Sequence, residues 1–142
     1  MRIRFKAWLL IALGAFVAVN LAPVRAAEVT PDAIKARGVL RVGVKYDSPP
    51  FGALDPRTSQ VTGFDIDLAR AIAKTILGDE NKVQLVQVTS VNRIPQLENG
   101  NIDLIIATMT ITQDRLKQID FSNVYYVAGE SLLVKKSSPI DS

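Results

Sequence analysis

Apolar residues follow two spacings along this chain, and each spacing predicts its own kind of element. The β-branched stretches Val39–Val44 and Lys82–Val88 predict buried strands. Between them, Gly63–Gly78 carries apolar residues at helical spacing, with acids in its first turn and a glycine at its end, which predicts a helix. A third stretch, Ile102–Ala107, is apolar on both faces, as expected of a central strand in a covered parallel sheet. The segment Lys45–Thr62 is rich in Pro, Gly, Asp and Ser and predicts a loop.

Two shorter helices are predicted from their ends. Thr30 can cap a helix that has Pro31 at its first position and Gly38 just past its end. Proline has no N–H to donate and fits only in a first turn, so Pro95 predicts a helix that begins near Asn92.

The carboxyl-terminal part is predicted to hold one more helix and one more extended segment. Thr112 can cap a short helix, and Tyr125–Lys136 predicts an extended segment that runs into a polar linker. Strands that alternate with helices imply right-handed β-α-β crossovers. The predicted fold class is therefore α/β, with an open, mostly parallel sheet and helices on both faces.

The first residues have the regions of a secretory signal peptide. Met1–Ala26 begins with basic residues, continues with the apolar run Ala7–Val19 and closes with small residues. A membrane anchor would need about 20 apolar residues, and Asn20 and Pro23 interrupt the run before that. We expect cleavage after Ala26 and a periplasmic protein.

The predicted leader also changes the meaning of the basic composition. The chain has 17 Lys and Arg against 14 Asp and Glu, and removal of the leader leaves 13 against 14. A nucleic-acid partner is therefore not expected. The absence of Cys excludes disulfides and thiolate zinc sites, and the absence of His removes the commonest general base. No glycine-rich phosphate loop is present, so no cofactor is expected.

Two arginines occupy positions that electrostatics disfavours. Arg93 and Arg115 each fall in the first turn of a predicted helix that follows a buried strand, where the helix dipole favours acids. Their placement suggests a bound anion approached by helix starts, backbone N–H groups and guanidinium groups together. Six residues follow the carboxyl ends of predicted strands, where ligands of open α/β sheets bind. These residues are predicted to line one rim: Lys45, Ser90, Arg93, Thr108, Thr110 and Arg115.

Arg115 has two interpretations that spacing alone leaves open. With Thr108 and Thr110 it would form a carboxylate clamp, because its planar fork suits a carboxylate bidentately. Alternatively, it is a surface arginine paired with Asp114 or Asp120.

The other rim residues also have plainer explanations. Arg93 could hold a second acidic group or pair with Glu98, and Lys45 could add positive charge or be merely solvated. Ser90 is either a ligand contact or a turn residue before a helix.

Several acids are set aside as functional groups. Asp65 and Asp67 are explained by the dipole of their helix, and their spacing does not converge on one ligand, so no metal is expected. Asp103 and Asp120 are predicted to bond nearby backbone rather than to act as catalytic acids. Nothing in the sequence indicates an activated nucleophile.

A resemblance to a known family rests on motifs that run through nearly all of the predicted mature chain. In order they are GVLRVGV, PPFG, GFDIDLARAIAK, TSVNRIPQLENGNIDLI, ATMTITQDR and IDFSNVYYVAGESLLVKK. They resemble the family-3 extracellular solute-binding proteins of polar amino-acid ABC transporters. TSVNRIP resembles the members that bind glutamate and aspartate.

The resemblance implies the first lobe of a type II periplasmic binding protein, which delivers an acidic amino acid to a membrane permease and is not an enzyme. It implies that Arg115, Thr108 and Thr110 hold the α-carboxylate of the ligand. The residues implied for the side-chain carboxylate are Arg93, Ser90 and Lys45.

Relatives of this kind have two lobes, and this sequence stops at Ser142, about where the chain would first cross between them. The expected organisation is a signal peptide at 1–26, an incomplete lobe at 27–136 and the start of an inter-lobe linker at 137–142, with the second lobe absent. Two alternatives remain at this point. One is an enzyme on the same fold, similar to cyclohexadienyl or arogenate dehydratase, and the other is the ligand-binding domain of a membrane-anchored sensor.

Overall fold

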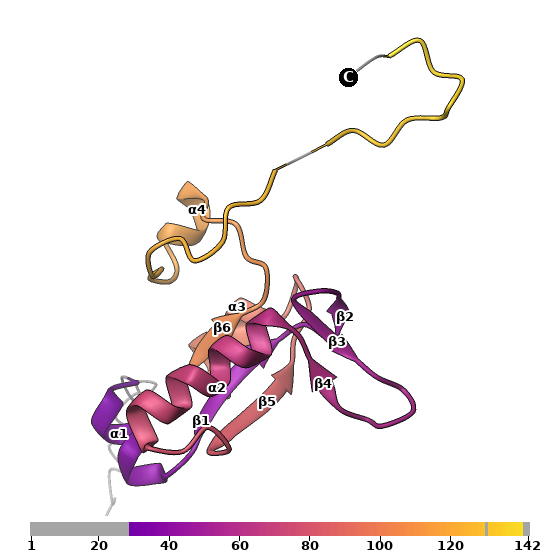
Figure 1. Cartoon of the computed structure of the whole chain (residues 1–142). Coiled ribbons are helices and arrows are strands. Elements are labelled where there is room, and N and C mark those ends of the chain that lie inside the picture. Colours follow the sequence, from indigo (N-terminus) through magenta and orange to yellow (C-terminus); the bar gives the residue numbers. More distant parts are fainter. Residues whose placement is uncertain (1–28, 130, 141–142) are drawn as a thin grey trace, which may run out of the picture.

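The computed structural model describes residues 29–129 and 131–140, and the predicted signal peptide lies outside them. The main sheet has three parallel strands, β1 (Leu40–Val44), β5 (Val83–Gln87) and β6 (Leu104–Ile106), in the order β5-β1-β6 (Figure 1). The α/β prediction with a parallel sheet is thus confirmed.

The central strand of this sheet is β1, so the prediction of a central strand at Ile102–Ala107 is wrong. β6 lies at one end of the sheet and pairs only with β1 among the described strands. Its stretch is apolar for another reason. Ile102 and Ala107, on either side of β6, are fully buried in a cluster with Val88 on the far side of the sheet from α2.

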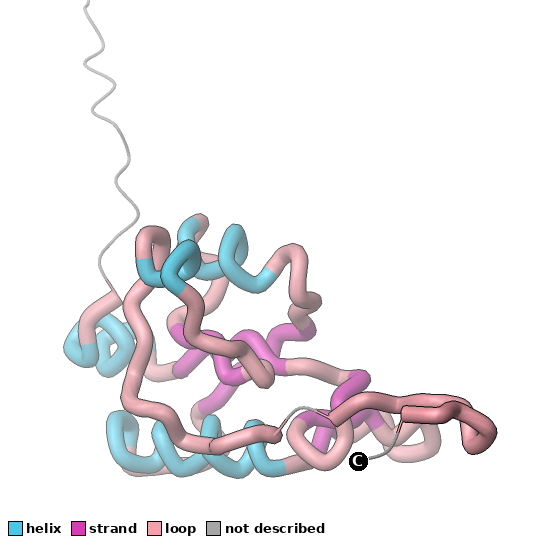
Figure 2. The backbone as a smooth tube through the Cα atoms, turned by 90° about the horizontal axis from the view of Figure 1, so that it is seen from above, coloured by secondary structure: helices cyan, strands magenta, loops and turns pink. Residues whose placement is uncertain are grey.

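Helices cover both faces of the sheet, as predicted (Figure 2). On one face, α1 (Pro31–Arg37) and α2 (Phe64–Leu77) pack against β1 through a core that includes Ile34 and Ile66. On the other face, α3 (Arg93–Glu98) packs through Leu97 against the cluster around Val88.

The predicted helix ends are confirmed by their caps. The Thr30 side chain accepts from the Ala33 N–H at 3.2 Å, and Gly38 follows α1 with φ +77°. Gly63 stands before α2 with φ +134°, and a Cβ there would lie 2.3 Å from the Phe51 carbonyl oxygen. Glycine is required at this position both by the backbone conformation and by the close approach of another chain segment.

A second, antiparallel sheet lies where the sequence predicted only a loop. It consists of β2 (Asp47–Ser48), β3 (Gly52–Leu54) and β4 (Val61–Thr62). Strands of two or three residues are too short to produce a recognisable alternation of apolar and polar positions. For that reason the prolines and glycines dominate the pattern of this stretch.

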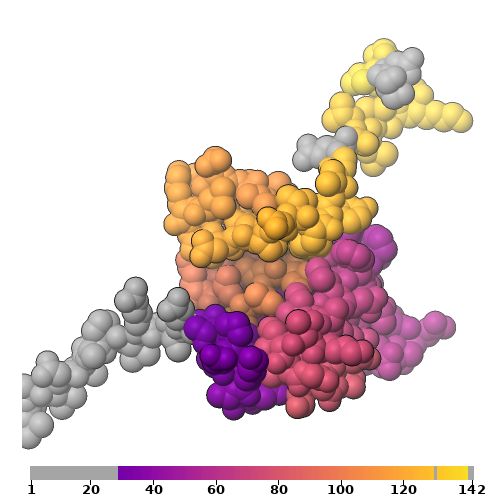
Figure 3. Space-filling view, turned by 60° about the vertical axis from the view of Figure 1, so that its left-hand side comes forward, coloured from indigo at the N-terminus to yellow at the C-terminus, as the bar shows by residue number. Residues whose placement is uncertain are grey.

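The carboxyl-terminal part contains α4 (Gln113–Leu116), with Thr112 accepting from the Arg115 N–H at 3.4 Å as its cap. The segment Tyr125–Lys136, predicted to be extended, forms no strand among its described residues. Figure 3 shows the residues up to 129 packed on the body of the molecule, whereas residues 131–140 stand away from it. Their side chains are mostly exposed, so apolar composition alone did not produce a strand.

An ionic network ties together the amino ends of β1 and β6. The Asp103 side chain is fully buried and forms ion pairs with Arg37, at the end of α1, and with Arg41, at 2.8 Å. It also accepts from the Arg41 backbone N–H at 2.8 Å. Asp103 does bond backbone, as predicted, but the backbone belongs to the distant residue Arg41 and not to a local turn. The two ion pairs were not predicted.

None of the helices in the described part of the chain is long and apolar enough to cross a membrane.

Candidate functional site

The carboxyl ends of the three parallel strands meet at one edge. In the register, Val44 lies beside Gln87 on one side and beside Ile106 on the other. The chain segments that leave this edge, residues 45–46, 88–93 and 107–115, are called the rim below. All six predicted site residues belong to the rim, and they differ in burial and in contacts.

Arg93 is the first residue of α3 and is only 4% exposed. Its Nη1 donates to the Ala107 carbonyl oxygen at 2.8 Å, while its buried Nε has no hydrogen-bond partner among the described residues. It forms no ion pair with Glu98 or with any other acid that the structure describes, so the plainer interpretation of Arg93 is wrong. Burial lowers the pKa of Arg93, and the nearby charge of Arg115 lowers it further. The guanidinium is therefore held close to another positive charge without a matching acid in the described part of the chain.

Arg115 lies in α4, partly buried, and its Nη1 donates to the Thr110 carbonyl oxygen at 2.6 Å. The proposed surface pair with Asp114 is wrong, because Asp114 pairs instead with Lys117 at 2.8 Å. Among the described residues Asp120 forms no ion pair either. Since a guanidinium has five N–H donors, most of those on Arg115 remain for a ligand.

Lys45 is not simply solvated. Its side chain is 14% exposed, and its Nζ lies 3.2 Å from a carboxylate oxygen of the exposed Asp47. Ser90 lies exposed in the turn before α3. The bonds that shape this turn come from its neighbours, since Thr89 and Asn92 exchange two hydrogen bonds of 2.7 and 3.2 Å.

Thr108 and Thr110 are both exposed, on the segment that follows β6. The backbone of Thr108 has φ +47°, in the left-handed region that residues other than glycine and asparagine rarely adopt. Thr108 stands two residues after the end of β6, within the rim segment 107–115. Strain of this kind persists only where the surroundings hold it, and it gathers at functional sites.

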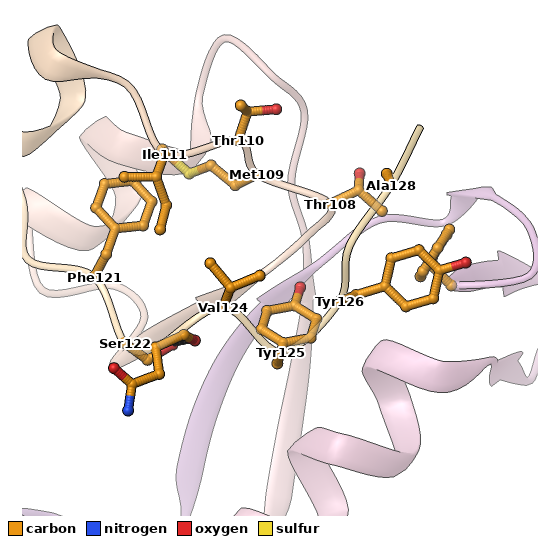
Figure 4. Close-up of a pocket in the computed structure, with 12 residues that line it drawn as sticks. Thr108, Met109, Thr110, Ile111, Phe121, Ser122, Val124, Tyr125, Tyr126 and Ala128 are labelled. Atoms are coloured by element: carbon orange, nitrogen blue, oxygen red, sulfur yellow. Dashed lines mark hydrogen bonds between the residues drawn. The ribbon is translucent and has the colours of Figure 1, made fainter. Parts of the chain in front are cut away.

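A pocket of about 430 Å³ lies between two segments, 108–111 and 121–128 (Figure 4). Thr108 and Thr110 belong to its lining, together with apolar side chains such as Met109, Ile111 and Val124. Of the predicted site residues, Lys45, Ser90, Arg93 and Arg115 do not line it. The threonines thus form the boundary between an apolar pocket and the positively charged rim.

Sequence reasoning missed the importance of Asp65. This acid in the first turn of α2 is fully buried, whereas its neighbour Asp67 is exposed. Asp65 Oδ1 accepts from the Tyr125 hydroxyl at 3.4 Å, and its Oδ2 has no partner among the described residues. Burial raises the pKa of Asp65, and the nearby Thr108 backbone and the Tyr125 hydroxyl partly offset that rise. Burial likewise raises the pKa of Tyr125, to about 12, with a further contribution from the charge of Asp65.

An aromatic cluster beside the pocket was also missed. Phe51 packs edge-on against Tyr126 with ring centres 4.8 Å apart, and Phe64 stacks on Tyr125 at 6.2 Å. Such pairs stabilise a fold beyond the burial of their surface. The sequence offered one signal, since Tyr125 and Tyr126 are adjacent and Phe51 follows two prolines, but nothing local showed that these segments meet.

The family "Bacterial extracellular solute-binding proteins, family 3" matches residues 40–140. This range contains all six predicted site residues and both sheets.

Curated relatives with high identity are binding proteins rather than enzymes. The chain is 61% identical over 113 residues to a glutamine-binding protein of Geobacillus stearothermophilus, covering 80% of this chain and 43% of that protein. It is 56% identical over 110 residues to the glutamine-binding protein of the Bacillus subtilis ABC transporter, covering 78% and 40%. It is 38% identical over 119 residues to the glutamate/aspartate import solute-binding protein of Escherichia coli, covering 81% and 39%. The chain thus spans about two fifths of the length of these relatives.

Solved structures show the same fold. Domain 1 of the arginine-binding protein of T. maritima, in an arginine-bound Phe57Trp mutant, gives a TM-score of 0.65 at 42% identity, over 70% of this chain and 74% of that one. An ancestral amino-acid-binding protein, described as a precursor of cyclohexadienyl dehydratase, gives 0.62 at 46% identity, over 68% and 40%. The fold is therefore that of one lobe of a type II periplasmic binding protein.

Proposed function

Since the chain belongs to the bacterial extracellular solute-binding proteins of family 3, we propose that it binds an acidic amino acid at the rim. Glutamate and aspartate are the ligands that this site suits best. The binding is recognition without chemistry, because the rim holds hydrogen-bond donors and positive charge and no activated nucleophile was identified in the sequence.

The observation that carries this proposal is the pair Arg93 and Arg115. Their charges are close enough for Arg115 to lower the pKa of Arg93, and neither forms an ion pair with a described acid. Two guanidinium groups held together repel each other, and a bound amino acid with two carboxylates would offset that repulsion at both of them. Charge-assisted hydrogen bonds to carboxylates are about twice as strong as neutral ones, so the ligand would gain affinity from both arginines.

The two carboxylates of the ligand are assigned to different parts of the rim. Arg115, with the hydroxyl and N–H donors of Thr108 and Thr110, would hold the α-carboxylate, because its remaining donors are free beside that segment. Arg93 and Lys45 would hold the side-chain carboxylate, with Ser90 as an added donor. Lys45 would then exchange Asp47 for the ligand, an exchange that its 3.2 Å ion pair to an exposed acid permits.

The export, domain organisation and transport role of this chain are proposed from its family. We propose a leader at 1–26, a ligand-binding lobe at 27–136 and the beginning of an inter-lobe linker at 137–142. The protein would act outside the cytoplasmic membrane and would hand its ligand to the permease of an ABC transporter. The second wall of the site in a whole receptor would come from a second lobe.

Glutamine is the second candidate ligand, and the relatives named above favour it. The two relatives of 61% and 56% identity are described as glutamine-binding proteins. Glutamine offers the same α-carboxylate and a side-chain oxygen in the same place, so it could use the same rim. Glutamine lacks the second negative charge, so only its α-carboxylate would offset the repulsion between Arg93 and Arg115.

Calorimetric titration of the expressed chain with glutamate, aspartate, glutamine and arginine tests this proposal. A site open on one side leaves its ion pairs screened, so millimolar affinity that weakens further with salt is expected for glutamate or aspartate. Preference for glutamine would move the assignment to the second candidate. Preference for arginine, or no binding of any of the four, would refute an anion site at the rim.

A further inference from the structure

Lys45 differs from the other cations of the rim, because it is already bound to an acid. Its Nζ lies 3.2 Å from Oδ1 of Asp47. Arg93 and Arg115 form no ion pair with any acid in the described part of the chain. A ligand that approaches the rim therefore meets two unpaired guanidinium groups and one amine that holds a carboxylate.

The two members of this ion pair are buried to very different degrees. The Lys45 side chain is 14% exposed, whereas the Asp47 side chain is 73% exposed. The network of Asp103 has the reverse arrangement, with a fully buried acid between two partly exposed arginines. Separating a buried carboxylate from its partners is strongly destabilising, but an exposed carboxylate can return to water at little cost. The Asp103 network is thus structural, and the pair of Lys45 with Asp47 is exchangeable.

The backbone keeps Asp47 within reach of Lys45. The Val44 carbonyl oxygen accepts from the Val88 N–H at 3.0 Å, which ties the chain to the main sheet just before Lys45. The Tyr46 carbonyl oxygen accepts from an N–H of β3 at 2.9 Å, and Asp47 itself pairs with β3 in the antiparallel sheet. Because the chain is hydrogen-bonded on both sides of Lys45, the spacing of the two side chains is set without a ligand.

An acidic ligand would have to compete with Asp47. Under the proposed function, Lys45 and Arg93 hold the side-chain carboxylate of the ligand. That carboxylate either displaces Asp47 from the amine or stands beside it. Displacement loses an ion pair, and coexistence brings two negative charges together, so both alternatives reduce the affinity for an acid.

A ligand with a side-chain amide avoids this competition. The amide oxygen can accept from Arg93 or from Lys45, and the amide NH₂ group can donate to the Asp47 carboxylate, which stays in place. Asp47 therefore acts against an acidic side chain and in favour of an amide. Discrimination between similar ligands commonly uses such a repulsive element beside the attractive ones.

We propose that Asp47 is a specificity-determining residue that, through its ion pair with Lys45, lowers the preference of the rim for glutamate over glutamine. This inference rests on the proposed function for the identity of the ligands. The arginines make the site suit an acid, and Asp47 limits how strongly an acid is preferred to its amide.

Three variants of the full chain separate this role from a general effect of charge. Asp47→Asn and Asp47→Ser both remove the carboxylate and leave the backbone pairing with β3 available. Asp55→Asn is the matched control, because Asp55 lies between β3 and β4 of the same small sheet and pairs with Arg57, at 3.8 Å, instead of with a rim cation. Thermal melting establishes that each variant is folded.

The first measurement needs no ligand. Nuclear magnetic resonance of the Lys45 side-chain amine reports on the group that the amine contacts. We expect its nitrogen resonance to shift in Asp47→Asn and in Asp47→Ser, and to stay in place in Asp55→Asn. A resonance that neither Asp47 variant moves overturns the ion pair and the proposal with it.

The second measurement is calorimetric titration with glutamate and with glutamine. The affinity for glutamate relative to that for glutamine should rise about three- to fivefold in both Asp47 variants, which is the range of an exposed ion pair. The same ratio should not change in Asp55→Asn. A rise no larger in the Asp47 variants than in Asp55→Asn overturns the specificity role and leaves the proposed function intact. If the unchanged protein binds neither glutamate nor glutamine, the proposed function fails, and the specificity role fails with it.

Discussion

Replacing Arg115 by glutamine is the sharpest test of the α-carboxylate clamp. The change removes one positive charge but keeps a planar amide, which can still donate to the Thr110 carbonyl oxygen now bonded by the guanidinium at 2.6 Å. The variant should therefore fold, with a loss of at most about 1 kcal/mol in the free energy of unfolding.

The expected loss of affinity follows from the donors that Arg115 keeps free. One of five N–H groups is used by Thr110, and a bidentate carboxylate would take two of the others. Charge-assisted bonds contribute about 1.5–3 kcal/mol each, and partial exposure reduces their sum to about 2–3 kcal/mol. Affinity should then fall roughly 30- to 150-fold. Glutamate and glutamine should lose equally, because the α-carboxylate is common to both.

The matched control is Lys117→Gln, two residues further along. Lys117 is exposed and already paired with Asp114 at 2.8 Å, so its replacement removes the same formal charge without touching the clamp. Calorimetric titration of both variants with both ligands should show a loss for Arg115→Gln alone. Equal small losses in the two variants would mean that Arg115 acts only through the general field of the rim. A loss for glutamate but not for glutamine would assign Arg115 to the side-chain carboxylate instead.

Three further predictions concern stability. Gly43→Ala should lower the free energy of unfolding by about 1–3 kcal/mol, because the added Cβ would lie 2.6 Å from Ile102 Cδ1; an unchanged urea midpoint would contradict this packing. Asp103→Asn should cost about 2–3 kcal/mol in the same assay, since it weakens the bonds to Arg41 around a buried carboxylate; a loss below about 0.5 kcal/mol would show that the network is screened. The raised pKa of Asp65 means that its carboxyl favours the folded state fully below the unfolded pKa of about 3.9, and this contribution disappears as pH rises through the folded pKa. Asp65→Asn should therefore gain stability relative to the unchanged protein as pH rises above about 4, and parallel plots of stability against pH for the two proteins would contradict the shift.

The elements that the sequence predicted well are those with strong local signals. Helix α1 was bounded correctly because Thr30, Pro31 and Gly38 act through bonds within a few residues of themselves. The start of α3 followed from the missing N–H of Pro95. That one constraint placed Arg93 at the first position of the helix, before any knowledge of what its side chain contacts.

What the sequence could not predict depends on contacts between distant segments. The end position of β6 is a property of strand order, which apolar composition does not encode. The burial of Asp65 depends on Tyr125, sixty residues away. A helix-dipole explanation was sufficient for Asp67 and incomplete for Asp65, although both stand in the same turn.

The candidate site was predictable as a location and only partly as a set of contacts. The rule that ligands bind beyond the carboxyl ends of strands brought six residues to one rim, and the register places their segments there. The partner of each charge was not predictable. Lys45 pairs with Asp47, and Arg93 donates to the Ala107 carbonyl oxygen. Other acceptors stand at similar distances along the sequence from each cation, so only the folded positions of the side chains determine which acceptor is used.

The ionic network of Asp103 lies at the opposite end of the strands from the rim, one strand length away, or roughly 16 Å for the five residues of β1. Under the proposed function, the integrity of the sheet and the choice of ligand would therefore be encoded by different residues. A library that randomises Lys45, Ser90 and Thr110 could be selected for new amino acids without drawing on the residues that anchor the sheet. The lobe accordingly offers a starting scaffold for reagentless amino-acid sensors, with an attachment point for a dye or a surface at the Asp103 end that leaves the recognition end open.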